Sequence, residues 1–113
     1  MALVPLIANY PTSCSPISVY WCIFLTDDSY SPNPVEVTVG QTVLWTNDDT
    51  AFHTVTSGII GAADSGTIFD SGLAGPTALI SKGKTFEHTF DTAGEFPYFC
   101  TLHPAMVGTV IVK

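Results

Sequence analysis

The sequence predicts an all-β fold, a Greek-key antiparallel β-sandwich of seven to eight strands. No segment of useful length repeats apolar residues at the helical period. Short runs rich in β-branched and aromatic residues recur instead, and Gly, Pro, Asn and Asp separate them. The chain has 113 residues, of which 46% are hydrophobic, and this suits a single domain over residues 1–113 with a packed core.

The first half of the chain contains three expected strands. Residues 17–25 are rich in β-branched and aromatic residues on both faces, which indicates a buried strand, and residues 1–16 before them are expected to be irregular. Residues 31–34 interrupt the pattern with two prolines. Residues 35–39 alternate cleanly between apolar and polar, and residues 43–46 form the next run after a turn.

The second half continues in the same way. Strands are expected at residues 53–57, 67–69, 85–90, 96–100 and 108–112. Residues 58–78 are glycine-rich and only weakly patterned. Residues Phe86, His88 and Phe90 share one face of their strand because successive side chains alternate. His88 is therefore interpreted as a structural residue.

Charge is sparse and mostly negative. Three Lys and no Arg stand against ten Asp and Glu, which gives a formal net charge of -7. Such a surface repels phosphate backbones and anionic lipid, so nucleic acid is excluded as an expected partner. Residues 1–8 are apolar but too short to span a bilayer, and they lack the basic region of a signal peptide. We expect no membrane insertion.

The three cysteines, Cys14, Cys22 and Cys100, cannot all pair within one chain. Cys14 and Cys22 are interpreted either as a disulfide or as two buried thiols. A disulfide would indicate an oxidising compartment. In both cases Cys100 remains available for chemistry.

A possible metal site follows from the spacing of Cys100, His103 and Met106, which lie three residues apart between two expected strands. A loop there can bring a thiolate, an imidazole and a thioether to one point. His53, which follows a polar turn, is the best candidate for a second imidazole. Two His and one Cys in a plane, with a weak axial Met, is the arrangement of blue-copper electron-transfer sites.

Each of these residues also has a structural explanation when it is taken alone. A single Cys or Met is usually a core residue, and a single His is usually a satisfied polar residue. The combination is hard to explain by packing. Zinc is the competing metal, but it rarely binds a thioether and its structural sites usually contain more Cys.

The segment from Cys100 to Met106 resembles the ligand loop of the amicyanin- and plastocyanin-like cupredoxins. The residues 31–40, 43–47 and 53–55 follow the same family's pattern in order, and the resemblance covers residues 28–113. It implies a cupredoxin-like sandwich with one type 1 copper, held by His53, Cys100, His103 and Met106.

The resemblance also implies how the site would be used. The edge of His103 would emerge through an apolar patch framed by Phe52, Leu102, Pro104 and Ala105. Proteins of this family are exported, so the location implied is extracytoplasmic, in the periplasm or on the outer face of the cell membrane. Thr54 departs from the family, in which many members have Asn after the first His.

The leading hypothesis is a soluble carrier that moves one electron at a time between a redox protein donor and a redox protein acceptor, and we expect a monomer. A copper site with an open or weak axial position that reacts with a small ligand such as nitric oxide is one alternative. Copper storage or delivery is another. A copper enzyme is not expected, because only His88 remains to hold a second, catalytic copper.

Overall fold

The computed structural model describes residues 20–26, 28–71, 81–103 and 105–113. Eight strands and no helix occur in these ranges. The strands are β1 (Tyr20–Thr26), β2 (Ser29–Ser31), β3 (Val35–Val37), β4 (Thr42–Asn47), β5 (Thr56–Ser57), β6 (Thr85–Thr89), β7 (Gly94–Phe99) and β8 (Val107–Val112). No helix in the described ranges is long and apolar enough to cross a membrane.

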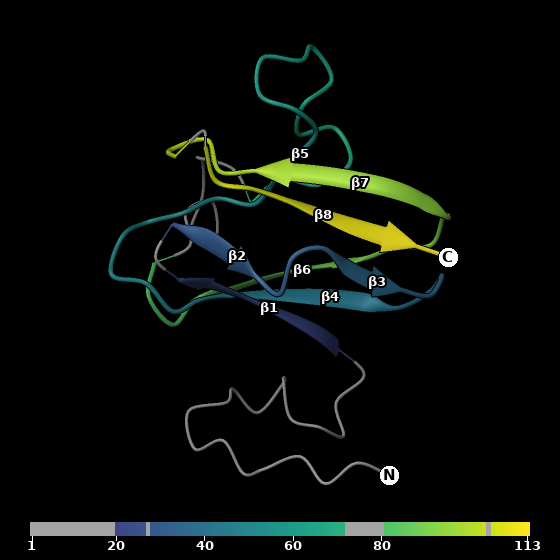
Figure 1. Cartoon of the computed structure of the whole chain (residues 1–113), viewed down its shortest axis with the longest axis horizontal. Coiled ribbons are helices and arrows are strands. Elements are labelled where there is room, and N and C mark those ends of the chain that lie inside the picture. The colour runs from purple at the N-terminus through teal and green to yellow at the C-terminus, as the bar shows by residue number, and fades with distance from the viewer. Residues whose placement is uncertain (1–19, 27, 72–80, 104) are drawn as a thin grey trace, which may run out of the picture.

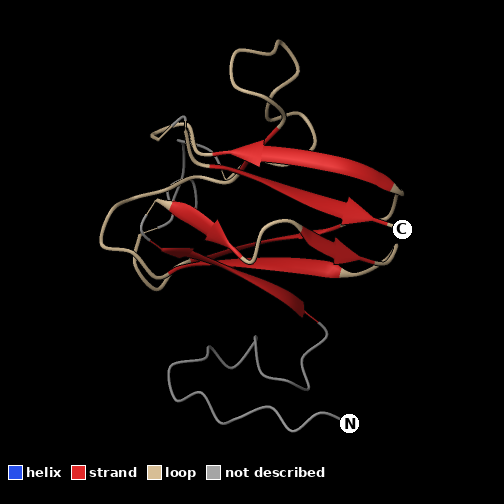
Figure 2. Ribbon diagram, in the orientation of Figure 1, coloured by secondary structure: helices blue, strands red, loops and turns tan. Residues whose placement is uncertain are grey.

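The strands form two four-stranded sheets that pack face to face (Figures 1 and 2). One sheet has the order β2-β1-β4-β6 and the other has the order β3-β8-β7-β5. From β2 to β7 the chain changes sheet at every connection. The predicted all-β sandwich is confirmed, with eight strands.

The strand pairing is mixed, whereas we predicted an antiparallel sandwich. β1 pairs with β4 in parallel, and β3 pairs with β8 in parallel. The remaining pairs are antiparallel. The alternation of apolar and polar residues along a strand reveals which side chains face the core, but it does not reveal which other strand lies beside it in the sheet. Because most connections cross between sheets, hydrogen-bonded neighbours are seldom consecutive in the chain.

Two predicted strands differ for a local reason. The expected strand 53–57 is reduced to β5, because the N–H of Thr54 points to Cys100 Sγ and that of Val55 to Ser71 Oγ.

The expected strand 67–69 is absent, because Ser57 Oγ accepts the N–H groups of Ile68 and Phe69. β2 lies partly in the segment that we expected to interrupt the sheet.

The core is built around Trp45, a fully buried residue of β4. Its ring lies 5.5 Å from Phe69, 5.7 Å from Phe86 and 5.4 Å from Tyr98, measured between centroids. Phe90 is also buried in this cluster. The cluster joins the two sheets, which makes the sandwich a firm support for the loops at its ends.

Tyr98 needs a glycine opposite it. Tyr98 on β7 pairs with Gly108 on β8, and a Cβ added at Gly108 would lie 2.4 Å from the Tyr98 ring. On its other side Tyr98 meets Tyr30 edge to face, with 4.6 Å between centroids. The Tyr30 hydroxyl donates a 2.7 Å hydrogen bond to the carbonyl of Thr54. The core thereby fixes the backbone directly after His53.

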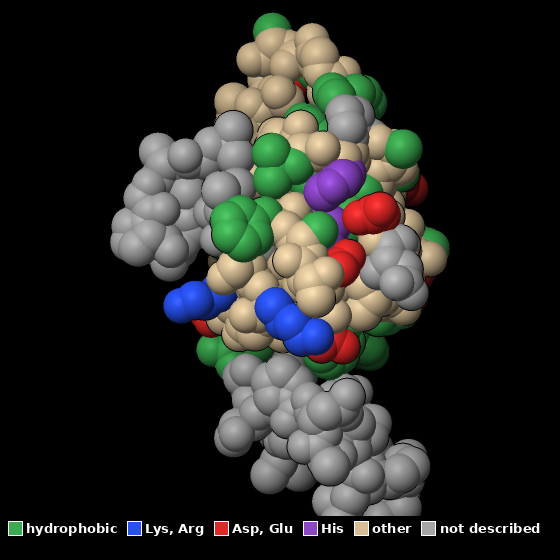
Figure 3. Space-filling view, turned by 90° about the vertical axis from the view of Figure 1, so that its left-hand side faces the viewer, with side chains coloured by type: hydrophobic (Ala, Val, Ile, Leu, Met, Phe, Trp, Pro, Cys, Tyr) green, Lys and Arg blue, Asp and Glu red, His purple; other side chains and the backbone are tan. Residues whose placement is uncertain are grey.

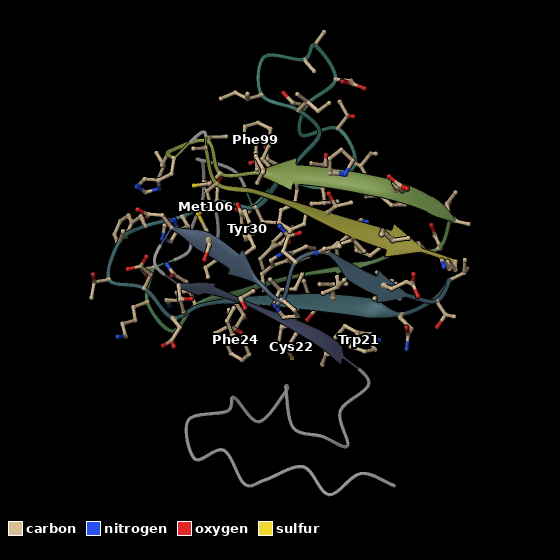
Figure 4. All side chains as sticks on the ribbon, in the orientation of Figure 1. Trp21, Cys22, Phe24, Tyr30, Phe99 and Met106 are labelled. Atoms are coloured by element: carbon tan, nitrogen blue, oxygen red, sulfur yellow. The ribbon has the colours of Figure 1, made fainter. Side chains whose placement is uncertain are left out.

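Cys22 is disulfide-bonded, whereas Cys100 is a free thiol. This resolves for Cys22 the choice between a disulfide and a buried thiol. Figure 4 shows Cys22 and Phe24 on the outer side of β1, away from the opposite sheet. Cys14 and the expected irregular segment 1–16 lie outside the described residues.

Candidate metal centre

Three predicted ligand residues converge at one end of the sandwich. Cys100 directly follows β7, His103 lies in the β7–β8 loop, and His53 precedes β5. The Cys100 Sγ lies 3.8 Å from His53 Nδ1 and 3.6 Å from His103 Nδ1. The three donor atoms all lie within 4.8 Å of one another. The residues therefore form a compact Cys-His-His cluster although His53 and Cys100 are far apart in sequence.

The spacing of the donors suits a bound metal ion. A metal about 2.3 Å from a sulfur and about 2.0–2.1 Å from a nitrogen separates these donors by about 3.5–3.8 Å when the angle lies between tetrahedral and trigonal. Both distances from Cys100 Sγ match this range. The donor set of one thiolate and two imidazoles suits copper.

The loop that carries Cys100 and His103 is closed by its own backbone. Cys100 N–H donates to the Met106 carbonyl at 3.0 Å, and Met106 N–H donates to the His103 carbonyl at 2.8 Å. His103 N–H donates to the Cys100 carbonyl at 3.3 Å. Met106 is buried, and Figure 4 places it at the end of the sandwich where this loop lies. Pro104 lies outside the described residues.

Thr54 joins the two halves of the cluster. Its backbone N–H points to Cys100 Sγ at 3.3 Å, and its Oγ1 accepts a 2.9 Å hydrogen bond from the N–H of Thr101. Its hydroxyl also meets that of Thr56, which donates to Asp70 at 2.9 Å. The resemblance left open how Thr54 would replace an Asn. The structure shows that its hydroxyl ties the loop that carries Cys100 and His103 to the segment that carries His53.

Two acidic residues that the sequence analysis did not connect with the site lie at the outer edges of the imidazoles. Asp49 Oδ2 lies 3.0 Å from His53 Nε2. Asp28 Oδ1 lies 3.9 Å from His53 Nε2 and 4.0 Å from His103 Nε2. The hydrogen bond with His53 lowers the pKa of the Asp49 carboxyl to about 2. The spacing of Asp49 and His53 was visible in sequence, but Asp28 could be placed only by the fold.

Asn47 builds the turn that comes before His53. The structure shows that its Oδ1 accepts the N–H of Asp49 at 2.7 Å and that its Nδ2 donates to the carbonyl of Ala51 at 2.9 Å. These bonds fold residues 47–51 into a compact turn and so set the direction from which His53 enters the site.

The cluster is closed to solvent except at one edge. His53 and Cys100 are fully buried, whereas the His103 side chain is 36% exposed. The neighbouring Phe52 and Leu102 are exposed apolar residues. Figure 3 views this end of the molecule and shows a histidine next to acidic side chains, with hydrophobic side chains on the same face.

His88 lies elsewhere in the molecule. It pairs with Val43, next to the last pair of the β4–β6 ladder, and its ring packs 5.0 Å from Phe69 and 4.7 Å from Phe90. Burial lowers its pKa. Within the described ranges, the groups of potential ligand atoms include His53 and do not include His88.

Comparison with protein families identifies residues 26–113 as a match to the copper-binding proteins of the plastocyanin/azurin family. Amicyanin from Paracoccus versutus is 33% identical over 88 residues. The chloroplastic plastocyanin from Tetradesmus obliquus is 35% identical over 86 residues. In each case the match covers 74% of this chain and only 58% of the relative's length.

Solved structures show the same similarity in three dimensions. A purple cupredoxin from Nitrosopumilus maritimus matches with a TM-score of 0.64 and 31% identity, over 82% of this chain and 99% of that protein. A reduced amicyanin variant matches with a TM-score of 0.65 and 30% identity, over 83% of this chain and 82% of the variant.

Proposed function

This chain belongs to the copper-binding plastocyanin/azurin family, and on that basis we propose that it carries single electrons between redox proteins. The observation that supports this most strongly is the Cys-His-His cluster at the end of a rigid sandwich, with donor spacings that suit one copper ion. A carrier of one electron needs only one such centre.

The proposed ligands are His53 and His103 through Nδ1, Cys100 through its thiolate, and Met106 as a weak axial thioether. The contacts of Cys100 Sγ with both Nδ1 atoms support the first three. The burial of Met106, and the backbone bonds that tie it to Cys100 and His103, support the fourth.

Copper supplies a one-electron couple between Cu(I) and Cu(II). The role of the protein is to keep the donor atoms in place in both oxidation states, since rearrangement would raise the barrier to electron transfer. The hydroxyl of Thr54 and the closed loop from Cys100 to Met106 provide this restraint. The N–H of Thr54 further supports negative charge on Cys100 Sγ.

Electrons would enter and leave at the exposed edge of His103. Phe52 and Leu102, which directly precede the two histidines in the sequence, are both exposed, and such an apolar surface can meet a partner without losing hydrogen bonds to water. Ala105, which we also expected in this patch, is exposed too. The donor and the acceptor would dock here in turn, each as a protein with its own redox centre.

We also propose an extracytoplasmic location, and a monomer as the working form. The disulfide at Cys22 supports the location, because disulfides persist in oxidising compartments. An electron carrier also has to exchange partners, and one exposed His edge per chain meets that need.

Repeated electrochemical cycling of the copper-loaded chain tests the proposal. A carrier gives a reversible one-electron wave and keeps its copper through many cycles in the presence of a Cu(I) chelator. Loss of copper at the first reduction would favour delivery of the metal. A change of the wave on adding nitric oxide would favour the hypothesis of an open axial position.

A further inference from the structure

The outer nitrogen of His53 faces a carboxylate inside the protein. His53 is fully buried, and its Nε2 lies 3.0 Å from Asp49 Oδ2. The Asp49 side chain is itself only 19% exposed. This contact is therefore shielded from water, and it is stronger than an ion pair on an open surface.

Asp49 is held in this position by the turn around it. Its carboxylate receives the N–H of Ala51 at 3.4 Å and the backbone N–H of Asp28. Its own N–H is bound by Asn47 Oδ1 at 2.7 Å. Asp28 has a positive φ of 56°, a conformation that Asp tolerates better than most residues. Two separate segments thus direct the same carboxylate at His53.

The contact fixes which nitrogen of His53 carries the proton. A carboxylate accepts hydrogen bonds, so the proton of the neutral ring belongs on Nε2. The lone pair then belongs to Nδ1, which is the atom that faces Cys100 Sγ at 3.8 Å. A carboxylate behind a ligand His also makes the imidazole a better electron donor to the metal.

Resting on the proposed function, we propose that Asp49 is a positioning residue that holds His53 as an Nδ1 ligand and lowers the reduction potential of the centre. An electron-rich imidazole and a nearby negative charge stabilise Cu(II) more than Cu(I). Asp28 acts in the same direction with less effect, because it is 62% exposed and lies 3.9 Å from His53 Nε2.

The test compares variants that each remove one negative charge. Asp49→Asn is expected to lower the ratio of Cu(II) to Cu(I) at a fixed applied potential by tenfold or more. This corresponds to an upward shift of the reduction potential of the centre by about 59 mV or more. Asp28→Asn is expected to give a smaller upward shift. Asp91→Asn is the matched control, because Asp91 lies two residues after Thr89, which pairs with Thr42 at the end of β4 away from the site.

Asp49→Glu provides the rescue, since it restores a carboxylate and should return the potential toward that of the native chain. If Asp49 only closed the turn, Asp49→Asn would lower the stability of the protein without raising its reduction potential more than Asp28→Asn does. That result would overturn the proposal. Equal shifts in Asp49→Asn and Asp91→Asn would overturn the proposal.

A measurement on the native Cu(I) protein does not depend on whether a variant folds. Nuclear magnetic resonance should show a downfield, slowly exchanging proton on His53 Nε2. A rapidly exchanging or absent proton would overturn the proposal. The visible spectrum of the native Cu(II) protein tests the proposed function separately. If that spectrum is not of type 1, the proposed function is overturned as well.

Discussion

Thr54 shows how one small residue serves the site from two sides. Its N–H points to Cys100 Sγ, and its Oγ1 accepts the N–H of Thr101. The side chain is fully buried, so water cannot replace a lost hydrogen bond. The Thr54 hydroxyl can therefore hold the ligand loop in place, at a position where many members of the family have Asn.

We predict that Thr54→Val lowers the free energy of unfolding by about 1–3 kcal/mol, because it leaves the Thr101 N–H without its acceptor. Thr54→Ser keeps the hydroxyl and should lose less. Denaturant unfolding of the metal-free proteins measures both. Equal stability of the Val variant and the native chain would contradict the assigned hydrogen bond.

Met106 is the proposed ligand for which the reduction potential is the most direct readout. Replacement by Leu keeps the volume and removes the thioether, so the three remaining donors should still bind copper. We expect the reduction potential to rise by tens of millivolts, on the scale of about 59 mV for a tenfold change in the ratio of oxidised to reduced protein. Protein-film voltammetry measures the shift. An unchanged potential would mean that Met106 is not an axial ligand.

At the scale of strands, the β7–β8 pair depends on one close approach. Tyr98 lies over Gly108, with no room for a Cβ between the ring and the strand. Gly108→Ala should therefore destabilise the protein by about 1–3 kcal/mol through overpacking. Thr109→Ala, on the same strand, is the control and should cost less. Thermal unfolding compares the two, and equal losses would contradict the packing assigned to Tyr98.

Four of the strands could be predicted closely from the sequence. β4, β6, β7 and β8 appear within two residues of their expected ends. The expected strands at 53–57 and 67–69 were mostly wrong, because their N–H groups bond to side chains and to Cys100 Sγ instead of to a neighbouring strand. Alternation does not reveal such bonds.

The candidate site could be predicted to a similar extent. The grouping of His53, Cys100 and His103 follows from residue types and from loop spacing, and the structure brings their donor atoms together. The approach of Asp28 to both imidazoles could not be foreseen, because it depends on where the β1–β2 connection meets the β4–β5 connection. The local sequence around Asp28 does not reveal this long-range contact.

At the scale of the whole molecule, charge should govern encounters with redox partners. The formal net charge is -7, and Asp28 is exposed beside His103. A cationic cobalt phenanthroline oxidant should therefore react faster at low salt and slow as salt is added, whereas hexacyanoferrate should show the opposite trend. Stopped-flow rates measure this dependence. Rates that do not change with salt for either reagent would contradict it.

The most direct test of the whole account is the visible absorption and electron paramagnetic resonance spectrum of the Cu(II)-loaded chain, measured beside that of Cys100→Ser. We predict intense thiolate-to-copper charge-transfer bands and a compressed copper hyperfine splitting in the native chain. Both features should be lost in the variant while its fold is largely kept. A weak, ordinary Cu(II) spectrum in the native chain, or a strongly coloured Ser variant, would contradict the assignment of Cys100 as a copper ligand.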